Sequence, residues 1–364
     1  MNNIGIYIHV PFCAGKCPYC DFYSRLPSPH AAEAYVLAVE ESLTAFAAKY
    51  PDRLVDTVYF GGGTPSLLGG ELLCRLLKAV KANFTVTSDA EVTLEANPGS
   101  VDQNFFDTIK VGGFNRLSMG LQSANEEELK FLGRKHSAED AAKAVKMARK
   151  AGFNNISLDL MMGLPGQTEE LLAKSIDFCA ALDVEHISSY ILKIEENTPF
   201  GRQNIILPDE DDVSDLYLFA VDRLAEKGYP QYEISNFAKE GLFSRHNTRY
   251  WKCSEYIGIG PSAHSYMEGK RFYFGRSTED FLAGKEPIPD GEGGSFEEFV
   301  MLGLRLTEGI SKVDCDNFGE NNFALLLKKA QKIPRNLIKT SEDNIALTKE
   351  GFLLSNTIIS MLVE

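Results

Sequence analysis

Residues 6–23 read IYIHVPFCAGKCPYCDFY and contain three of the seven cysteines, Cys13, Cys17 and Cys20. The apolar residues at positions 4, 6, 8 and 10 predict a strand that ends at Pro11, so the cysteines follow in a loop at its carboxyl end. Functional residues commonly lie at that end of the strands in α/β folds. Three thiolates in one loop predict a [4Fe–4S] cluster, which normally takes four, so that one iron stays free to bind another ligand.

Two other interpretations of the cysteine loop remain. Half of a zinc site would need a fourth ligand, and no nearby His or Cys supplies one. A disulfide with one spare thiol would need an oxidising compartment, and nothing in the sequence indicates export. The other cysteines, at positions 74, 179, 253 and 315, are scattered, and we expect them to be buried or idle thiols.

Strand-like and helix-like segments alternate six times. The strands are expected at 4–10, 56–61, 90–97, 115–122, 155–161 and 185–193, and the helices between them at 31–50, 71–83, 101–111, 138–151 and 169–182. Such alternation predicts an α/β fold with a parallel sheet, right-handed crossovers, and an open or closed barrel.

The predicted strands have one apolar and one polar face. Val92, Leu94 and Ala96 alternate with Glu91, Thr93, Glu95 and Asn97, and the segments 116–122 and 156–160 repeat the pattern. We expect the apolar faces to lie under the helices and the polar faces to line the inside, where they would hold a large polar ligand. The alternative is a polar core that satisfies its own hydrogen bonds, since each unpaired buried group costs ~1–3 kcal/mol.

Several motifs resemble a known family. The spacing Cys-x-x-x-Cys-x-x-Cys, with Tyr19 before the last cysteine, resembles the signature of radical S-adenosylmethionine (SAM) enzymes. The segments 7–12 (YIHVPF), 61–65 (GGGTP), 115–122 (NRLSMGLQ) and 159–165 (DLMMGLP) resemble the oxygen-independent coproporphyrinogen III oxidase group. Within that group, Phe22 stands where the oxidase has a further cysteine, and the oxidase's extension before the first strand is missing. Together with the segment 246–251 (HNTRYW), these features are similar to the HemW-type haem chaperones.

This resemblance implies a partial (β/α)6 barrel with a [4Fe–4S] cluster on Cys13, Cys17 and Cys20. It also implies two groups of cofactor contacts. Tyr7, Gly62 and Glu95 match contacts to the SAM on the cluster, with Tyr19 beside it, and Gly63, Thr64, Gln122, Arg134 and Asp159 match contacts to a second SAM in the oxidase. Alternatively, Arg134 and Asp159 simply pair with each other.

His246 is the candidate haem ligand. It lies in a predicted polar connection just before Tyr250 and Trp251, and an imidazole beside large aromatic rings suits haem iron. From the chemistry alone, a hydrogen-bonded histidine in the core is the competing interpretation, and the resemblance favours haem. His264, in the turn 258–264, is a second candidate.

Composition restricts the partners and the compartment. A formal net charge of −14 without a basic run disfavours nucleic acid. The sequence has no charged leader before an apolar core and no apolar run of about 20 residues, so we expect a cytoplasmic protein.

The sequence changes character past Lys193. We expect Asp209 to cap a helix at 213–227, a strand at 229–235, and a Pro/Gly-rich linker at 287–294. Helices at 296–306 and 323–331, a hairpin at 337–347 and a helix at 348–362 resemble a winged-helix unit. The predicted domains are therefore 1–286, a radical SAM barrel with an extension that carries the haem-binding motif, and 295–364, a helical C-terminal domain.

The resemblance implies a haem chaperone that binds the cluster, SAM and haem and inserts haem into respiratory apoproteins, with an electron donor and peripheral membrane contact. The alternatives are SAM-dependent oxidative decarboxylation of coproporphyrinogen III and a cluster-bearing interaction protein without SAM turnover. Whether the chain is an enzyme at all stays open, and coproporphyrinogen dehydrogenase activity is not expected.

Overall fold

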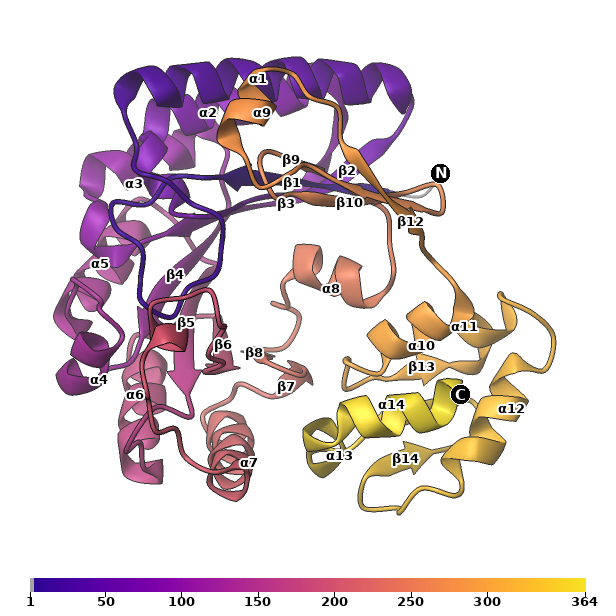
Figure 1. The fold of residues 1–364 in the computed structure, drawn as a ribbon. Coiled ribbons are helices and arrows are strands. Elements are labelled where there is room, and N and C mark those ends of the chain that lie inside the picture. The colour runs from indigo at the N-terminus through magenta and orange to yellow at the C-terminus, as the bar shows by residue number, and fades with distance from the viewer. Residues whose placement is uncertain (1–2) are drawn as a thin grey trace.

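A twelve-stranded sheet forms the centre of the computed structural model, which describes residues 3–364 (Figure 1). The strand order is β12-β11-β10-β9-β1-β2-β3-β4-β5-β6-β8-β7. Six neighbouring strands are parallel: β1 (Ile4–Val10), β2 (Leu54–Gly62), β3 (Thr85–Ala96), β4 (Arg116–Gln122), β5 (Ile156–Met162) and β6 (His186–Ile191). The predicted α/β fold with six parallel strands is confirmed.

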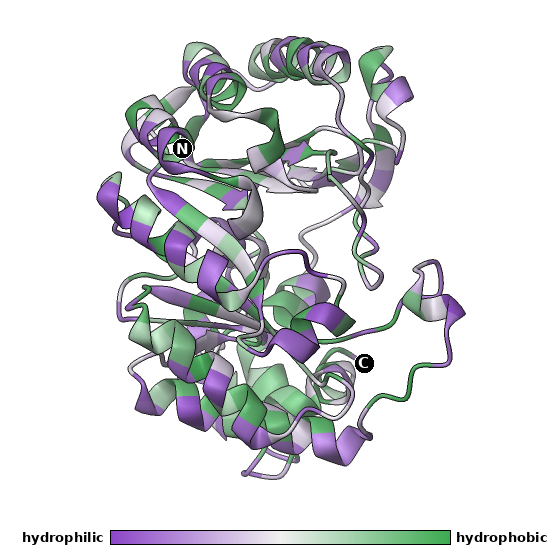
Figure 2. Ribbon diagram, turned by 90° about the vertical axis from the view of Figure 1, so that its left-hand side faces the viewer, coloured by the Kyte–Doolittle hydropathy of each residue, from purple (hydrophilic) through white to green (hydrophobic). Residues whose placement is uncertain are grey.

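Helices connect the parallel strands, because parallel neighbours need long crossovers. They are α1 (Pro29–Lys49), α2 (Gly70–Asn83), α3 (Gln103–Gly112), α4 (Glu126–Phe131), α5 (Ala138–Lys150) and α6 (Glu169–Ala181), with short 3₁₀ turns at Pro65–Leu68 and Pro98–Ser100. After β6, a 3₁₀ turn at Phe200–Arg202 and α7 (Glu210–Glu226) lead to the antiparallel strands at that edge. As predicted, Asp209 caps α7, and its carboxylate accepts a hydrogen bond from Asp212 N at 2.9 Å. Figure 2 shows that the helices mix hydrophobic and hydrophilic residues, as helices with one buried face do.

The two faces of the parallel strands differ as predicted. Leu117, Met119 and Leu121 of β4 are fully buried and belong to the main hydrophobic core. The alternate residues Arg116 and Ser118 are also buried, on the opposite face, which the strand curvature turns inward. The inside of this sheet is therefore polar.

Antiparallel strands extend both edges of the parallel sheet. On one side lie β7 (Gln231–Glu233) and β8 (Asn236–Ala238), and beyond β9 (Tyr256–Ile259), which is parallel to β1, lie β10 (His264–Met267), β11 (Lys270–Tyr273) and β12 (Ile288–Glu292). The helices α8 (Arg245–Trp251) and α9 (Thr278–Leu282) belong to the same part of the chain.

Two expectations about this part of the chain were wrong. The stretch 287–294 is not a free linker, because most of it forms β12, which pairs with β11. Its prolines mislead because an edge strand tolerates residues that cannot donate a ladder hydrogen bond. The strand expected at 229–235 shrinks to the three residues of β7.

The C-terminal unit has its own three-stranded sheet. Its elements are α10 (Phe296–Gly303), β13 (Ile310–Ser311), α11 (Lys312–Asp316), α12 (Asn322–Ala330), β14 (Ile338–Thr340), β15 (Asn344–Leu347), α13 (Lys349–Leu353) and α14 (Ser355–Val363). This order is winged-helix-like, as predicted, although the expected last helix is interrupted at Leu354. Lys349 pairs with both carboxylate oxygens of Asp222 on α7, which ties the unit to the main sheet.

None of the helices within residues 3–364 is long and apolar enough to cross a membrane.

Candidate functional site

The cysteine loop is fixed at the carboxyl end of β1. Cys13 N donates to Arg25 O at 2.9 Å, Arg25 N donates to Pro11 O at 2.8 Å, and Phe12 between them is fully buried. Cys20 N donates to Cys17 O at 3.1 Å. These bonds close the loop at its base and in its middle, and all three cysteines are half-buried free thiols.

Two of the predicted site residues lie against the cysteine sulfurs. Thr64 Oγ1 lies 3.4 Å from Cys13 Sγ, and Arg134 Nη1 donates to Cys17 Sγ at 3.5 Å. Burial raises the pKa of Cys20, the Phe22 N–H lowers it, and the neighbouring sulfurs of Cys17 and Cys13 raise it further. The Arg134 cation and the Thr64 hydroxyl next to the sulfurs favour the thiolate form, which is the form that binds a metal.

The donor set fits an iron–sulfur cluster better than a single ion. No three His, Cys, Asp or Glu side chains within residues 3–364 converge on a site for one metal ion. In a cubane cluster each thiolate binds a different iron, so three separated sulfurs in one loop suffice, and the fourth iron takes an external ligand.

The glycines after β2 let two loops pack directly on each other. Gly63 N donates to Val10 O at 2.8 Å, and a Cβ at Gly63 would lie 2.6 Å from Phe12 O. Gly62 has a φ of +105°, and a Cβ there would lie 2.6 Å from the His9 ring. These contacts within the chain explain why a side chain would not fit at either position. Contacts of Gly62 and Gly63 with SAM stay a prediction.

Glu95 lies at the centre of the inward face. Its carboxylate accepts hydrogen bonds from the Tyr59 hydroxyl at 2.7 Å and from Gly62 N at 3.2 Å. Burial raises the pKa of Glu95 to about 7, against the lowering effect of these two donors. Nearby, the Tyr7 hydroxyl lies 3.0 Å from Nδ1 of His9. The structure thus brings together Tyr7, Gly62 and Glu95, the three predicted contacts to the SAM on the cluster.

Three residues of the predicted second group lie around Gly120, whose register partner on β5 is Asp159, and their contacts with a second SAM stay a prediction. Gln122 and Arg134 both lie over Gly120: Arg134 Nη2 donates to Gly120 O at 3.0 Å, and a Cβ at Gly120 would lie 2.6 Å from Gln122 Nε2. Asp159 instead accepts from the Ser118 hydroxyl at 3.1 Å. Within residues 3–364 Arg134 and Asp159 form no ion pair, so the alternative that they simply pair is wrong.

Tyr19, a residue of the cysteine loop, packs against a small second hydrophobic cluster formed by Leu132, Met161, Leu164 and Leu192. Its ring centroid is 6.3 Å from that of Phe200. Burial raises its pKa, and the charge of Arg134 opposes this rise. The phenol is therefore neutral at physiological pH.

His246 lies in helix α8, and not in the polar connection that we expected. Helix α8 packs at the amino ends of β1 to β3, opposite the cysteine loop, between the main sheet and the C-terminal helices (Figure 1). Only 1% of His246 is exposed, with Nδ1 2.9 Å from Thr57 Oγ1 and Nε2 2.8 Å from the Tyr250 hydroxyl. Burial lowers its pKa to about 3, and the charges of Arg249 and Arg116 add to this effect.

The sequence did not reveal what holds α8. Glu91, on the inward face of β3, accepts hydrogen bonds from Arg245 N and His246 N, both at 3.0 Å. A side chain from the sheet therefore caps the helix. The ring of Tyr59 stacks on His246 with centroids 5.2 Å apart. The two-residue period of the strand predicted that Glu91 points inward, but the sequence did not predict that it binds the first residues of α8. His264, the second candidate, is exposed and stacks on Tyr273.

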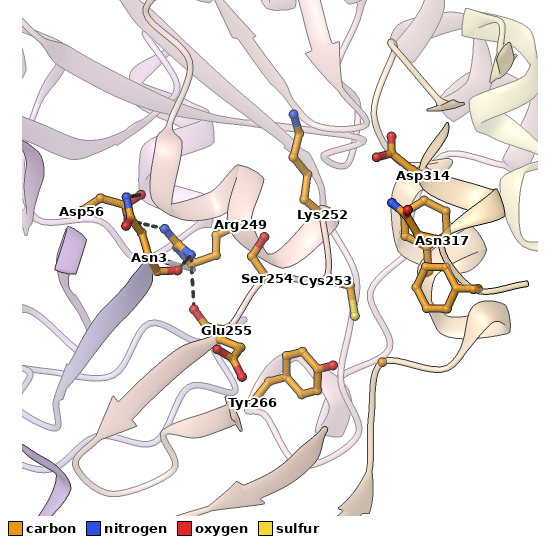
Figure 3. A pocket seen from close by; sticks show the side chains of 13 residues that line it. Asn3, Asp56, Arg249, Lys252, Cys253, Ser254, Glu255, Tyr266, Asp314 and Asn317 are labelled. Carbon is orange, nitrogen blue, oxygen red and sulfur yellow. Dashed lines mark hydrogen bonds and ion pairs between the residues drawn. The ribbon is translucent and has the colours of Figure 1, made fainter. Parts of the chain in front are cut away.

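A pocket of about 810 Å³ lies between the main sheet and the C-terminal unit (Figure 3). Its lining includes Asp56, Arg249, Lys252, Cys253 and Asp314. None of the predicted site residues lines it, so it is separate from the cysteine loop.

Comparisons with known proteins agree with this geometry. The radical SAM superfamily model matches residues 7–179, and the HemN C-terminal domain model matches residues 296–354. The chain is 36% identical to the heme chaperone HemW of Escherichia coli over 99% of this chain and 98% of that protein. It is 35% identical to the HemW of Bacillus subtilis over 97% of both chains. In structure it is similar to the coproporphyrinogen III oxidase HemN of Escherichia coli, with a TM-score of 0.84 and 23% identity over 99% of this chain and 90% of that one.

Proposed function

The chain belongs to the HemW family of the radical SAM superfamily, and from this premise we propose that it is a haem chaperone. In this proposal it holds a [4Fe–4S] cluster on Cys13, Cys17 and Cys20, binds SAM and haem, and passes haem to respiratory apoproteins. The observation that carries the proposal is the similarity along the whole chain to proteins named heme chaperone, at 34–36% identity.

The residues of the chain have separate tasks in this proposal. The cluster with SAM bound would supply one-electron chemistry, with electrons from a separate donor. The cysteine loop fixes the thiolates, Tyr7, Gly62 and Glu95 orient the SAM on the open iron, and Arg134 offsets the negative charge at Cys17. The half-burial of the thiols limits the access of water and oxygen to them.

We place haem at His246, which lies at the end of the inward face opposite the cysteine loop. Because both ring nitrogens are hydrogen-bonded in the haem-free structure, iron would replace the Tyr250 hydroxyl at Nε2. The ring is held neutral by burial, and neutral imidazole is the form that binds iron. We further propose that the protein acts in the cytoplasm and reaches its acceptors by peripheral contact with the respiratory membrane.

An anaerobic comparison tests the proposal. The full chain is reconstituted with iron and sulfide, and haem binding and conversion of coproporphyrinogen III are measured in parallel. We expect stoichiometric haem and no decarboxylated product. Protoporphyrinogen formation at enzymatic rates would make the oxidase the better assignment, and a protein that retains its cluster but binds no haem would refute the chaperone.

A further inference from the structure

Arg116 is a buried cation that the proposed function does not use. It is the first residue of β4, on the inward face, and lies opposite Thr93 of β3 in the sheet register. Only 2% of it is exposed, and it is the largest of the fully buried side chains in residues 3–364. The sequence analysis placed it only on the polar face of its strand.

The Arg116 side chain makes no hydrogen bond and no ion pair with residues 3–364. None of the hydrogen bonds, ion pairs or cation–π contacts among residues 3–364 involves its side chain, and its Nε is buried without an acceptor. Arginine keeps its positive charge in proteins, so the charge stays in this buried position. A buried charge without a partner costs several kcal/mol, so the position calls for an anion.

The carboxylates on the inward face accept hydrogen bonds from other groups, although Oε2 of Glu233 is buried without a hydrogen-bond partner among residues 3–364. Glu91 caps α8, Glu95 accepts from Tyr59 and Gly62, and Asp159 accepts from Ser118. Glu233 accepts from Ser235 N at 3.0 Å. None of these four carboxylates forms an ion pair with Arg116, although its charge opposes the rise that burial causes in the pKa of Glu95 and Asp159.

A hydroxyl group on the inward face is also unpaired. Thr93 Oγ1 is fully buried and has no hydrogen-bond partner among residues 3–364. Thr93 is the register neighbour of Arg116, so the two side chains leave neighbouring strands on the same inward face. A planar guanidinium binds a carboxylate with two parallel hydrogen bonds, and a hydroxyl can add a third.

We propose that Arg116, with Thr93 beside it, binds a carboxylate of the ligand that enters the inside of the barrel. The identity of that ligand rests on the proposed function, in which the carboxylate is a propionate of haem. The alternative source of the same chemistry is the amino-acid carboxylate of SAM. Tyr59, next to Thr93 in the register, stacks on His246. One haem could therefore place its iron at His246 and a propionate at Arg116.

The first test needs no ligand. Arg116→Met removes an unpaired buried charge and keeps an apolar side chain, so the ligand-free full chain should melt at a higher temperature than wild type. Arg335→Met, at an exposed arginine of the C-terminal unit, is the control and should leave the melting temperature unchanged. A lower melting temperature for Arg116→Met would mean that the arginine is part of the folded core, and would overturn the proposal.

The second test identifies the carboxylate, with optical titrations of the reconstituted protein. For haem, Arg116→Met should weaken binding about tenfold or more, as expected for lost charge-assisted hydrogen bonds, and Arg116→Lys should weaken it less. Haem dimethyl ester has no free propionate, so its affinity should be the same in wild type and Arg116→Met. An equal loss for haem and ester would overturn the propionate assignment.

Binding of SAM and of decarboxylated SAM is measured in the same variants by equilibrium dialysis. A loss specific to SAM would move the carboxylate to that source and overturn the haem propionate. If neither haem nor SAM depends on Arg116, the carboxylate site itself is refuted. A wild-type protein that binds no haem would refute the chaperone function, and the melting and SAM measurements would still decide the role of Arg116.

Discussion

Nε2 of His246 lies 2.8 Å from the hydroxyl oxygen of Tyr250, one turn further along the same helix. This bond occupies the nitrogen that we assign to haem iron, while Thr57 occupies the other one. Both ring nitrogens of His246 are therefore hydrogen-bonded, and haem binding would have to compete with a hydrogen bond inside the protein.

The competition at His246 can be measured directly. Tyr250→Phe removes the competing hydroxyl, so we expect haem affinity to rise about fivefold, in line with ~1 kcal/mol for one hydrogen bond. His246→Ala should abolish the axial-ligand absorption band. Optical titration of haem into both variants checks this, and weaker binding by Tyr250→Phe would contradict the assignment of Nε2 as the ligand.

The cap that Glu91 places on α8 should matter for stability. Its carboxylate accepts two backbone hydrogen bonds, whereas the amide of Glu91→Gln has only one oxygen acceptor, so we expect a loss of about 1–2 kcal/mol in the free energy of unfolding. Urea unfolding measures this loss. Glu71→Gln, at an exposed residue in the first turn of α2, is the matched control and should change the free energy by less than about 0.5 kcal/mol.

Glu95 predicts a pH dependence with a definite sign. Burial raises its pKa from 4.5 to about 7, so between these values the folded protein holds a proton that the unfolded chain has lost. Its contribution to stability therefore falls as the pH rises from about 4.5 to 7.

The difference between wild type and Glu95→Gln isolates this effect, because Glu233 and the buried histidines titrate in both proteins. Urea unfolding gives the free energy of unfolding of each protein. The value for Glu95→Gln minus the value for wild type should be larger at pH 8 than at pH 5. A constant difference across that range would mean that the carboxyl group is not held protonated.

The cluster assignment has a simple test. Cys17→Ser should lose the visible absorption of the anaerobically reconstituted protein together with most of its iron and sulfide, because two thiolates hold a cubane cluster poorly. Cys253→Ser, in the separate pocket of Figure 3, should retain both. Full colour in Cys17→Ser would count against the cluster on this loop.

Much of the fold and part of the site could be read from local sequence. The spacing of Cys13, Cys17 and Cys20 is a local property of one loop, and the two-residue period of β3 to β5 shows which side chains point inward wherever the strands are regular. The cap at Asp209 is local as well, since its partner is three residues away. Such features depend on a few neighbouring residues, whose geometry the backbone itself dictates.

The pairing of the inward polar residues is a different matter. Glu91 and His246 are 155 positions apart, and Arg134 reaches Cys17 across 117 positions. The irregular pairing of β4 with β5 between Gly120 and Gln122 interrupts the strand period at a predicted site residue. Long-range contacts of this kind follow from register, curvature and packing together. For that reason the sequence showed Arg116 as one more polar residue, and the fold of residues 3–364 showed it as a buried charge without a hydrogen bond or ion pair.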